Sequence, residues 1–242
     1  MDWISLHEYW DMVPQVNELA NYEQCMAYTD RVDHAVAEVR GLLTALRLEK
    51  KIKIAFDEWN LRSWHHPNVH TIQQGIGKDS YVTPRDKNDD NSQYTMADAV
   101  FTACFLSAMN RNCDIVGMAN FAPIINTRGC IFTTEKEIVL RSTYHVFDLY
   151  VNYLGDTVLD SWCEEMPELT VNHKYGAPVT VDTLDLLATK WTDKERYALA
   201  LVNKHPDEAQ TITVSMPEAQ GNAVIFTLNG PTRDSYNDIG RN

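Results

Sequence analysis

An alternation of short apolar segments with longer amphipathic segments over residues 3–154 most constrains the fold of this chain. Three of the segments are short and rich in β-forming residues, as buried strands are: residues 3–7, 52–56 and 115–122. Three longer segments carry apolar residues at helical spacing: residues 27–48, 96–109 and 141–154. Strands and helices that alternate in this way predict parallel β/α units.

The pattern changes after Gly155, where short β-prone segments follow one another with turn residues between them. These segments are residues 157–162, 179–187, 197–202, 211–216 and 224–228. Closely spaced strands without intervening helices predict an antiparallel β-sandwich. We therefore expect an α/β part followed by a sandwich, with the boundary near residues 152–156.

The charge of the chain argues against two classes of partner. Its 242 residues carry a formal net charge of -13 at pH 7. An acidic surface repels phosphate backbones and anionic lipids, so we expect no nucleic acid and no membrane partner. An uncharged polysaccharide would not be repelled. The first residues also lack the basic and apolar regions of a signal peptide.

Cysteine and histidine residues give little support for a disulfide framework or a metal site. The five cysteines are odd in number and include no Cys-x-x-Cys pair, which favours free thiols. His66 and His70 are four apart, but Pro67 disfavours the helix that would bring them together. Residues 60–95 are instead interpreted as a long polar loop, and loops of this length are often functional.

The segment Phe56-Asp57-Glu58-Trp59-Asn60 places two carboxylates where the second strand runs into a loop. In β/α barrels, the side chains at the C-terminal ends of the strands form the active site. Strand alternation predicts that Glu58 shares a face with Phe56 and that Asp57 lies on the opposite face. If the more apolar face is interior, Glu58 projects into a site and Asp57 is a structural acid. The alternative, which spacing alone favours, is that both acids merely end a strand.

Other segments occur in the order in which a known family has them. They are Ile4-Ser5-Leu6-His7-Glu8-Tyr9, Asp30-Arg31-Val32, Gly117-Met118-Ala119-Asn120-Phe121-Ala122-Pro123-Ile124, Asn126-Thr127-Arg128-Gly129, Thr143-Tyr144-His145-Val146-Phe147, Leu228-Asn229-Gly230-Pro231 and Tyr236-Asn237-Asp238. Together with residues 56–60, they resemble α-L-arabinofuranosidases of glycoside hydrolase family 51 over essentially the whole chain.

The resemblance implies a fold and an activity. Residues 1–154 would be strands six to eight of a (β/α)8 catalytic barrel, and residues 155–242 an incomplete C-terminal β-sandwich. The implied reaction is retaining hydrolysis of terminal α-L-arabinofuranosyl units from arabinan or arabinoxylan, with Glu58 as the nucleophile and with no metal or cofactor. Members of the family are commonly intracellular homo-oligomers, so we expect a cytoplasmic location and self-association for the full-length parent.

The resemblance also suggests residues that bind the substrate. His7 and Tyr9 share one strand parity, and we expect Tyr9 to hydrogen-bond Glu58 and His7 to line the site, although a core histidine is an equal alternative. Aromatic and amide side chains that follow the nucleophile would shape the sugar pocket: Trp59, Asn60 and Trp64. Simple packing is the alternative for Trp59. The family's strand-eight glutamine is missing, and Asn126 is favoured slightly over Asn120 as its substitute.

A second departure concerns the acid/base glutamate, which in the family follows an asparagine at the end of strand four. Asn17-Glu18 follows no strand, so we expect that the acid/base lies outside these residues and that the chain is a fragment. Two other interpretations stay open. In the first, the protein is another retaining barrel glycosidase, which acts on xylosides or glucosides. In the second, it is a non-catalytic module for carbohydrate binding or assembly.

Overall fold

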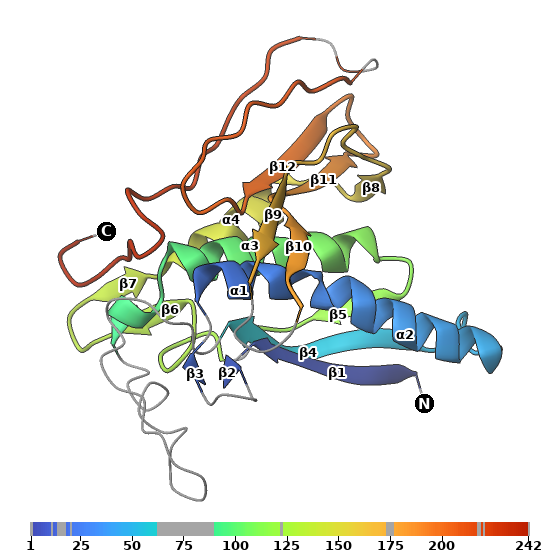
Figure 1. Cartoon of the computed structure of the whole chain (residues 1–242), viewed down its shortest axis with the longest axis horizontal. Coiled ribbons are helices and arrows are strands. Elements are labelled where there is room, and N and C mark those ends of the chain that lie inside the picture. Colours follow the sequence, from blue (N-terminus) through green and yellow to red (C-terminus); the bar gives the residue numbers. More distant parts are fainter. Residues whose placement is uncertain are drawn as a thin grey trace, which may run out of the picture.

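The computed structural model describes residues 2–10, 12–13, 18–19, 21–61, 90–121, 123–172, 177–216, 219 and 221–241. Figure 1 shows two layers in the first part of the chain, a short sheet and a layer of helices above it. Smaller antiparallel sheets lie on the far side of the helices.

The sheet contains β1 (Trp3–Trp10), β4 (Lys53–Leu61) and β5 (Val116–Ala119) in the order β1-β4-β5. All neighbours are parallel, so the carboxyl ends of the three strands lie at one edge. The connections contain α1 (Tyr22–Ala27), η1 (Tyr28–Asp30) and α2 (Arg31–Ala45) before β4, and η2 (Asn91–Gln93) and α3 (Met96–Arg111) before β5. The predicted parallel β/α units are therefore present.

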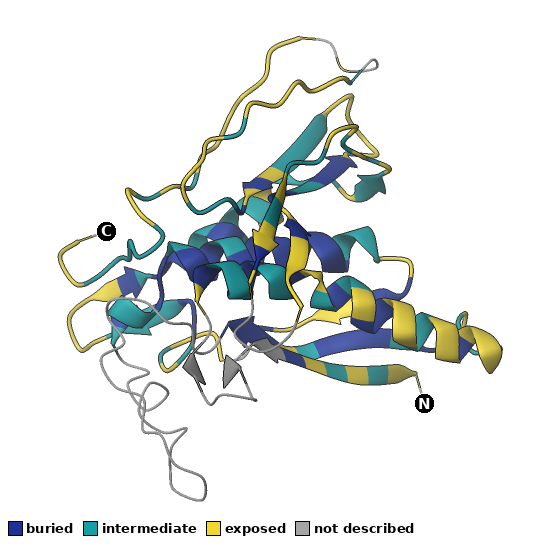
Figure 2. Cartoon of the chain, viewed as in Figure 1, coloured by how far each residue is buried: buried dark blue, intermediate teal, exposed yellow. Residues whose placement is uncertain are grey.

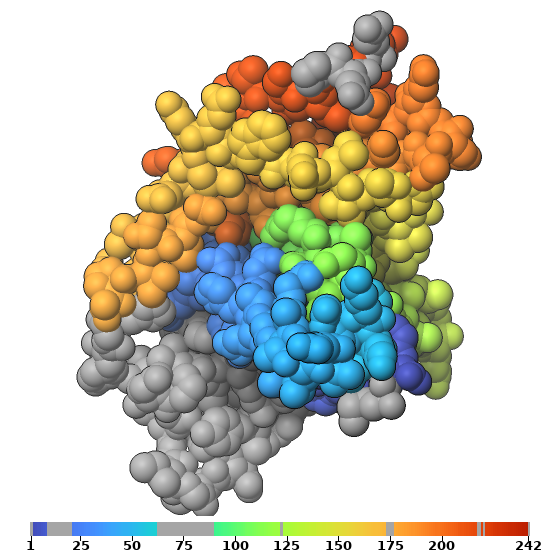
Figure 3. Space-filling view, turned by 90° about the vertical axis from the view of Figure 1, so that its right-hand side faces the viewer, coloured from blue at the N-terminus to red at the C-terminus, as the bar shows by residue number. Residues whose placement is uncertain are grey.

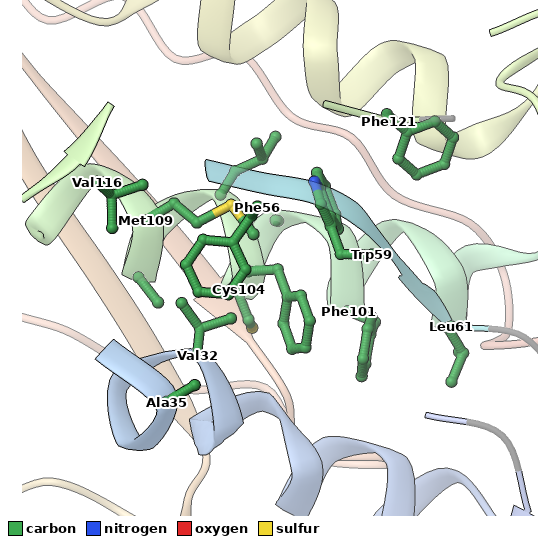
Figure 4. Close-up of a cluster of buried hydrophobic side chains, with 14 of the residues drawn as sticks. Val32, Ala35, Phe56, Trp59, Leu61, Phe101, Cys104, Met109, Val116 and Phe121 are labelled. Atoms are coloured by element: carbon green, nitrogen blue, oxygen red, sulfur yellow. The ribbon is translucent and has the colours of Figure 1, made fainter. Parts of the chain in front are cut away.

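The core forms between this sheet and the helices. Apolar residues of β4 pack with α2 and α3, and the set includes Ile54, Phe56, Trp59, Leu61, Val32, Val36, Phe101 and Phe105. Figure 4 shows Phe56, Trp59 and Leu61 along one strand, with Val32 and Phe101 from the two helices nearby. Figure 2 shows that α3 is buried around most of its circumference. The almost continuous apolar sequence of this helix explains that burial.

The N-terminus of α3 is fixed by two sets of partners. Thr95 and Asp98 form a capping box, which provides hydrogen-bond acceptors for backbone N–H groups that have no partner within the helix. The backbone N–H groups of Met96 and Ala97 donate to the carbonyls of Ser235 and Arg233, at 2.9 and 3.0 Å. The end of the described chain therefore docks on the helix that carries the core.

The remaining elements are short. A hairpin of β6 (Ile131–Thr133) and β7 (Ile138–Leu140) leads into α4 (Ser142–Tyr153). An antiparallel sheet follows, with order β12-β11-β8, made of β8 (Thr157–Leu159), β11 (Leu184–Lys190) and β12 (Tyr197–Asn203). Two further antiparallel pairs are β9 (Glu168–Val171) with β10 (Val179–Asp182), and β2 (Met12–Val13) with β3 (Glu18–Leu19). Small antiparallel sheets of this kind are consistent with a sandwich.

Two predicted strands are wrong. Residues 211–216 and 224–228 have no regular secondary structure, and Figure 1 shows them as two long coil segments. Their apolar residues are accordingly exposed, with Val224 at 75% and Ile225 at 84%. A strand forms only where a neighbouring strand can accept its backbone hydrogen bonds, and in the described part these segments have no such neighbour.

Charged side chains join the antiparallel part to the helices. Arg111 of α3 contacts Asp185 of β11 at 3.0 Å and Asp33 of α2 at 3.2 Å. The ammonium group of Lys204, after β12, donates to the Thr29 hydroxyl at 3.2 Å. Figure 3 shows the segment coloured yellow to orange above the blue α2. None of the helices in the described residues combines the length and apolar character that a membrane span requires.

Candidate active site

Polar side chains gather on the sheet face that the helices leave open. Ser5 and His7 of β1 and Asp57 and Glu58 of β4 meet there, near the middle of both strands. The side chains of His7, Asp57 and Glu58 are 51%, 39% and 48% exposed. A ligand can therefore approach all three.

His7 contacts both carboxylates. Its Nδ1 lies 3.6 Å from Oε2 of Glu58, and its Nε2 lies 3.4 Å from Oδ1 of Asp57. The Ser5 hydroxyl donates a hydrogen bond of 2.7 Å to the same Asp57 oxygen. His7 is therefore a half-exposed residue between two acids and not a core histidine, and its role in lining a site stays a prediction.

A register shift in the sheet explains why both acids reach His7. Leu6 is paired with Phe56, but His7 is paired with Glu58, so β4 has one extra residue at Asp57. An extra residue of this kind interrupts strand alternation. Phe56 and Trp59 both face the helices, and the two acids between them both face the open side. The expectations that Glu58 shares a face with Phe56 and that Asp57 lies on the opposite face from Glu58 are therefore both wrong.

The same shift places Trp59 in the core. Its side chain is fully buried, and its ring centroid lies 5.9, 5.3 and 6.1 Å from those of Phe105, Phe121 and Phe147. This position agrees with the packing alternative and not with a place in a sugar pocket. Asn60 is also buried, and its Oδ1 has no hydrogen-bond partner among the described residues.

Asn126 is engaged within its own loop. Its Oδ1 accepts hydrogen bonds from the Thr133 N–H at 2.7 Å and the Thr133 hydroxyl at 3.2 Å. The backbone φ of Asn126 is 55°, a left-handed conformation that asparagine tolerates better than most residues. The structure therefore gives this side-chain oxygen a structural task in the loop after β5.

Two of the residues predicted to bind the substrate have side chains that lie outside the described part of the structure. The backbone of Tyr9 pairs with Asn60 in β1, but its side chain lies outside the described residues, as does the whole of Trp64. His65, His66 and His70 also fall outside them. Within the described ranges, no group of three His, Cys, Asp or Glu side chains is arranged to hold a metal.

The sequence analysis overlooked Ser5 as a member of the site. The spacing of Ser5 could have identified it, because Ser5 lies two residues before His7 and therefore shares the same face of the strand. Glu8, by contrast, turns inward, where the hydroxyl of Tyr28 and the Nε of Arg31 donate to its Oε2 at 3.0 and 3.3 Å. Burial and the neighbouring Glu8 raise the pKa of Tyr28 to about 12.

Two exposed carboxylates on the open face of a parallel sheet can serve nucleophilic or acid–base chemistry. The sequence model of the alpha-L-arabinofuranosidase C-terminal domain matches residues 57–242, which is more than half of the chain. The chain therefore belongs to the alpha-L-arabinofuranosidase C-terminal domain family. The match begins at the two acids, with Asp57.

Curated relatives carry corresponding names. The chain is 28% identical over 236 residues to an intracellular exo-alpha-L-arabinofuranosidase of Bacteroides ovatus, covering 93% of this chain and 41% of that protein. It is 24% identical to an intracellular exo-alpha-(1->5)-L-arabinofuranosidase of Halalkalibacterium halodurans, over 93% of this chain and 42% of the relative. The chain thus spans about two fifths of the length of the relatives it matches.

Solved structures show the same fold. An alpha-L-arabinofuranosidase from Thermotoga maritima, crystallised with arabinose, aligns with a TM-score of 0.62 and 24% identity, over 87% of this chain and 39% of its own. A GH51 arabinofuranosidase from Xanthomonas axonopodis pv. citri aligns with a TM-score of 0.65 and 19% identity, over the whole of this chain and 46% of its own.

Proposed function

We propose that this protein hydrolyses terminal α-L-arabinofuranosides with retention of configuration, and that Glu58 is the nucleophile. The observation that carries the proposal is the exposed Glu58 on the open face of a parallel sheet, in contact with His7. The names of the curated relatives supply the substrate class. The role of Glu58 comes from the family resemblance of residues 56–60, and its exposure and its contact with His7 support that role.

In this mechanism, a carboxylate oxygen of Glu58 forms a bond to the anomeric carbon of the arabinofuranosyl unit. A second carboxylic acid donates its proton to the departing glycosidic oxygen as the bond to that oxygen breaks. A water molecule, deprotonated by the same second group, then attacks the anomeric carbon and releases Glu58. Retaining enzymes hold the two carboxyl groups about 5–5.5 Å apart. We expect the acid/base outside this chain.

The neighbours of Glu58 fit supporting roles. His7 lies between the two acids and can keep the Glu58 carboxylate in one orientation while the anomeric carbon approaches. The Asp57 carboxylate accepts a hydrogen bond from the Ser5 hydroxyl, which holds this carboxylate beside Nε2 of His7, on the other side of the imidazole ring from Glu58. Positioning of this kind favours a near-attack geometry. Tyr9, Asn60 and Trp64 remain candidates for the sugar pocket.

The domain assignment is part of the same proposal. Residues 1–154 would complete a (β/α)8 barrel together with strands supplied by the rest of a longer parent, and residues 155–242 would belong to its sandwich. The passage from α4, which ends at Tyr153, to β8, which starts at Thr157, fits this boundary. The names of relatives support an intracellular location, and homo-oligomerisation of the parent is carried over from the family resemblance.

The test compares matched variants of the intact gene product on 4-nitrophenyl α-L-arabinofuranoside. Glu58→Gln should reduce kcat by on the order of 10⁴-fold or more, because a nucleophile has no substitute in the site. Asp57→Asn is the matched control on the adjacent residue and should keep most of the activity. Equal loss in both variants would remove the special role of Glu58. Preference for a xyloside or glucoside would redirect the substrate class, and binding without turnover would indicate a non-catalytic module.

A further inference from the structure

The chain leaves β5 toward the loop at residues 123–130 next to the strand position of the two acids. Ala119 of β5 pairs with Phe56, and the N–H of Asn120 donates to the Phe56 carbonyl at 2.8 Å. Asp57 and Glu58 directly follow Phe56 on the neighbouring strand. The carboxyl end of β5, from which the chain continues to this loop, therefore lies next to the site, and loops at the carboxyl ends of strands form substrate walls in β/α proteins.

The backbone of this loop is strained. Asn126 and Thr127 have φ angles of 55° and 44°, which place two successive non-glycine residues in the left-handed region. Each such residue costs on the order of 1 kcal/mol, and strain of this kind persists only where the surroundings fix it. Gly129 is confined as well, because a Cβ there would lie 2.3 Å from the Ile124 carbonyl oxygen.

Arg141 supplies much of that fixation. It is fully buried at the start of α4, and its Nη1 donates to the carbonyls of Thr127 and Gly129 at 2.6 and 2.8 Å. Tyr94 also donates to the Thr127 carbonyl, at 2.8 Å, and its ring lies 3.7 Å from the guanidinium carbon. Burying a guanidinium is costly unless its donors are used, so this side chain strongly favours one loop conformation.

A second chain of contacts continues from Arg141 to the end of the described chain. Its Nε donates to Oδ1 of Asn91 at 2.9 Å, and Nδ2 of Asn91 donates to Oδ1 of Asp238 at 3.0 Å. Asn237 donates to the carbonyl of Leu140, next to Arg141, at 2.8 Å. Asp238 thus orients the side-chain amide of Asn91, and the oxygen of that amide accepts the hydrogen bond from Nε of Arg141.

We propose that Arg141 is a positioning residue for the reaction, which holds the 123–130 loop as one wall of the substrate site beside Glu58. It acts through the carbonyls of Thr127 and Gly129, and Asn91 and Asp238 set its orientation. The inference rests on the proposed arabinofuranosidase function.

The test uses the intact gene product and three variants. Arg141→Met removes the donors and keeps the length of the side chain. Gly129→Ala disturbs the same loop from its backbone and serves if Arg141→Met does not fold. Arg196→Met is the control, since Arg196 is exposed and lies over Trp191 just before β12. Hydrogen exchange read by mass spectrometry, the melting temperature, and kcat and KM on 4-nitrophenyl α-L-arabinofuranoside are measured for each.

For Arg141→Met and Gly129→Ala, we expect exchange in residues 123–131 to accelerate about tenfold or more, with residues 53–61 unchanged. KM should rise about tenfold while kcat changes by less than about threefold, because the wall binds substrate without reacting. Arg196→Met should match the wild type. Unaltered exchange in the loop, or faster exchange with an unaltered KM, would overturn the inference. A wild-type protein without arabinofuranosidase activity would overturn the proposed function instead, and the exchange would still decide whether Arg141 holds the loop.

Discussion

Nδ1 of His7 lies 3.6 Å from Oε2 of Glu58, across the β1–β4 pairing at the open face of the parallel sheet. The contact exists because β4 has one more residue than β1 at this point, which turns both Asp57 and Glu58 toward the same imidazole. Under strict alternation, one of the two acids would point into the core. The irregularity thus creates the polar cluster on which the proposed chemistry rests.

Replacing His7 should impair the reaction without unfolding the protein. His7→Gln keeps a polar side chain of similar length but cannot contact both carboxylates, so Glu58 loses its orientation. We expect kcat/KM to fall about 10- to 100-fold, a range typical of lost positioning, with the melting temperature nearly unchanged because His7 is half exposed. Steady-state kinetics and thermal unfolding check this. A wild-type kcat/KM would show that the contact is incidental.

Trp59→Phe distinguishes packing from sugar binding at this position. Trp59 is fully buried between Phe105, Phe121 and Phe147, so the smaller ring leaves a cavity. The loss should be about 1–3 kcal/mol of the free energy of unfolding, with KM unaltered. Urea unfolding followed by circular dichroism, together with kinetics, measures both. A raised KM at unchanged stability would instead return Trp59 to the sugar pocket.

Arg111→Met should destabilise the junction between α3 and β11. The substitution leaves Asp185, whose side chain is only 12% exposed, without its closest cation and costs about 3 kcal/mol. Burial already raises the pKa of Asp185, and Arg111 opposes that shift. Without Arg111 the pKa rises further, so the cost should shrink at acid pH, where Asp185 is protonated.

The matched control for this junction is the double variant Arg111→Met/Asp185→Leu. It removes both charges and should recover much of the lost stability, because the uncompensated carboxylate is gone. Chemical unfolding at pH 5 and pH 8 gives both comparisons. A double variant that is no more stable than Arg111→Met would contradict this account of the pair.

Tyr28→Phe should show a pH-dependent effect on stability. The folded pKa of Tyr28 is raised to about 12 from 10.0, first by burial and then by Glu8. A raised pKa contributes stability that is complete below the unfolded value and is lost as pH rises through the folded value. The wild-type protein should therefore exceed the variant by about 1–2 kcal/mol at pH 8, where the hydrogen bond to Glu8 is intact.

That advantage should decline above pH 10, since only the wild type carries the ionisable hydroxyl. Urea unfolding at pH 8, 10 and 11 follows the difference between the two proteins. A difference that stays constant over this range would show that Tyr28 ionises as easily in the folded state as in the unfolded chain.

The sequence predicted the first part of the fold better than the second. Helices expected at residues 27–48, 96–109 and 141–154 correspond to α2, α3 and α4, because each carries an apolar stripe or an apolar surface that the sheet and its neighbours bury. The segments at 211–216 and 224–228 have equally good β-forming composition, but composition does not supply a pairing partner. Pairing depends on the tertiary structure, which a single segment does not encode.

In the site, sequence reasoning selected Glu58 and His7 but misplaced Asp57 and Phe56 relative to Glu58. This error has one source, the extra residue at Asp57, which no local sequence pattern indicates. For Trp59, the structure agrees with the packing alternative that the sequence analysis left open. Arg141 was missed for a different reason. Its donors serve backbone carbonyls of a loop, so neither a motif nor a neighbouring acid marks it in the sequence.

Covalent trapping of the nucleophile tests the central claim most directly. The intact gene product is incubated with a mechanism-based arabinofuranosyl inhibitor that forms a slowly hydrolysed glycosyl–enzyme ester, then digested and sequenced by mass spectrometry. The account predicts one arabinofuranosyl adduct, on Glu58, which disappears in Glu58→Gln and persists in Asp57→Asn. An adduct on Asp57 or on another carboxylate, or turnover of substrate with inversion and no adduct, would contradict it.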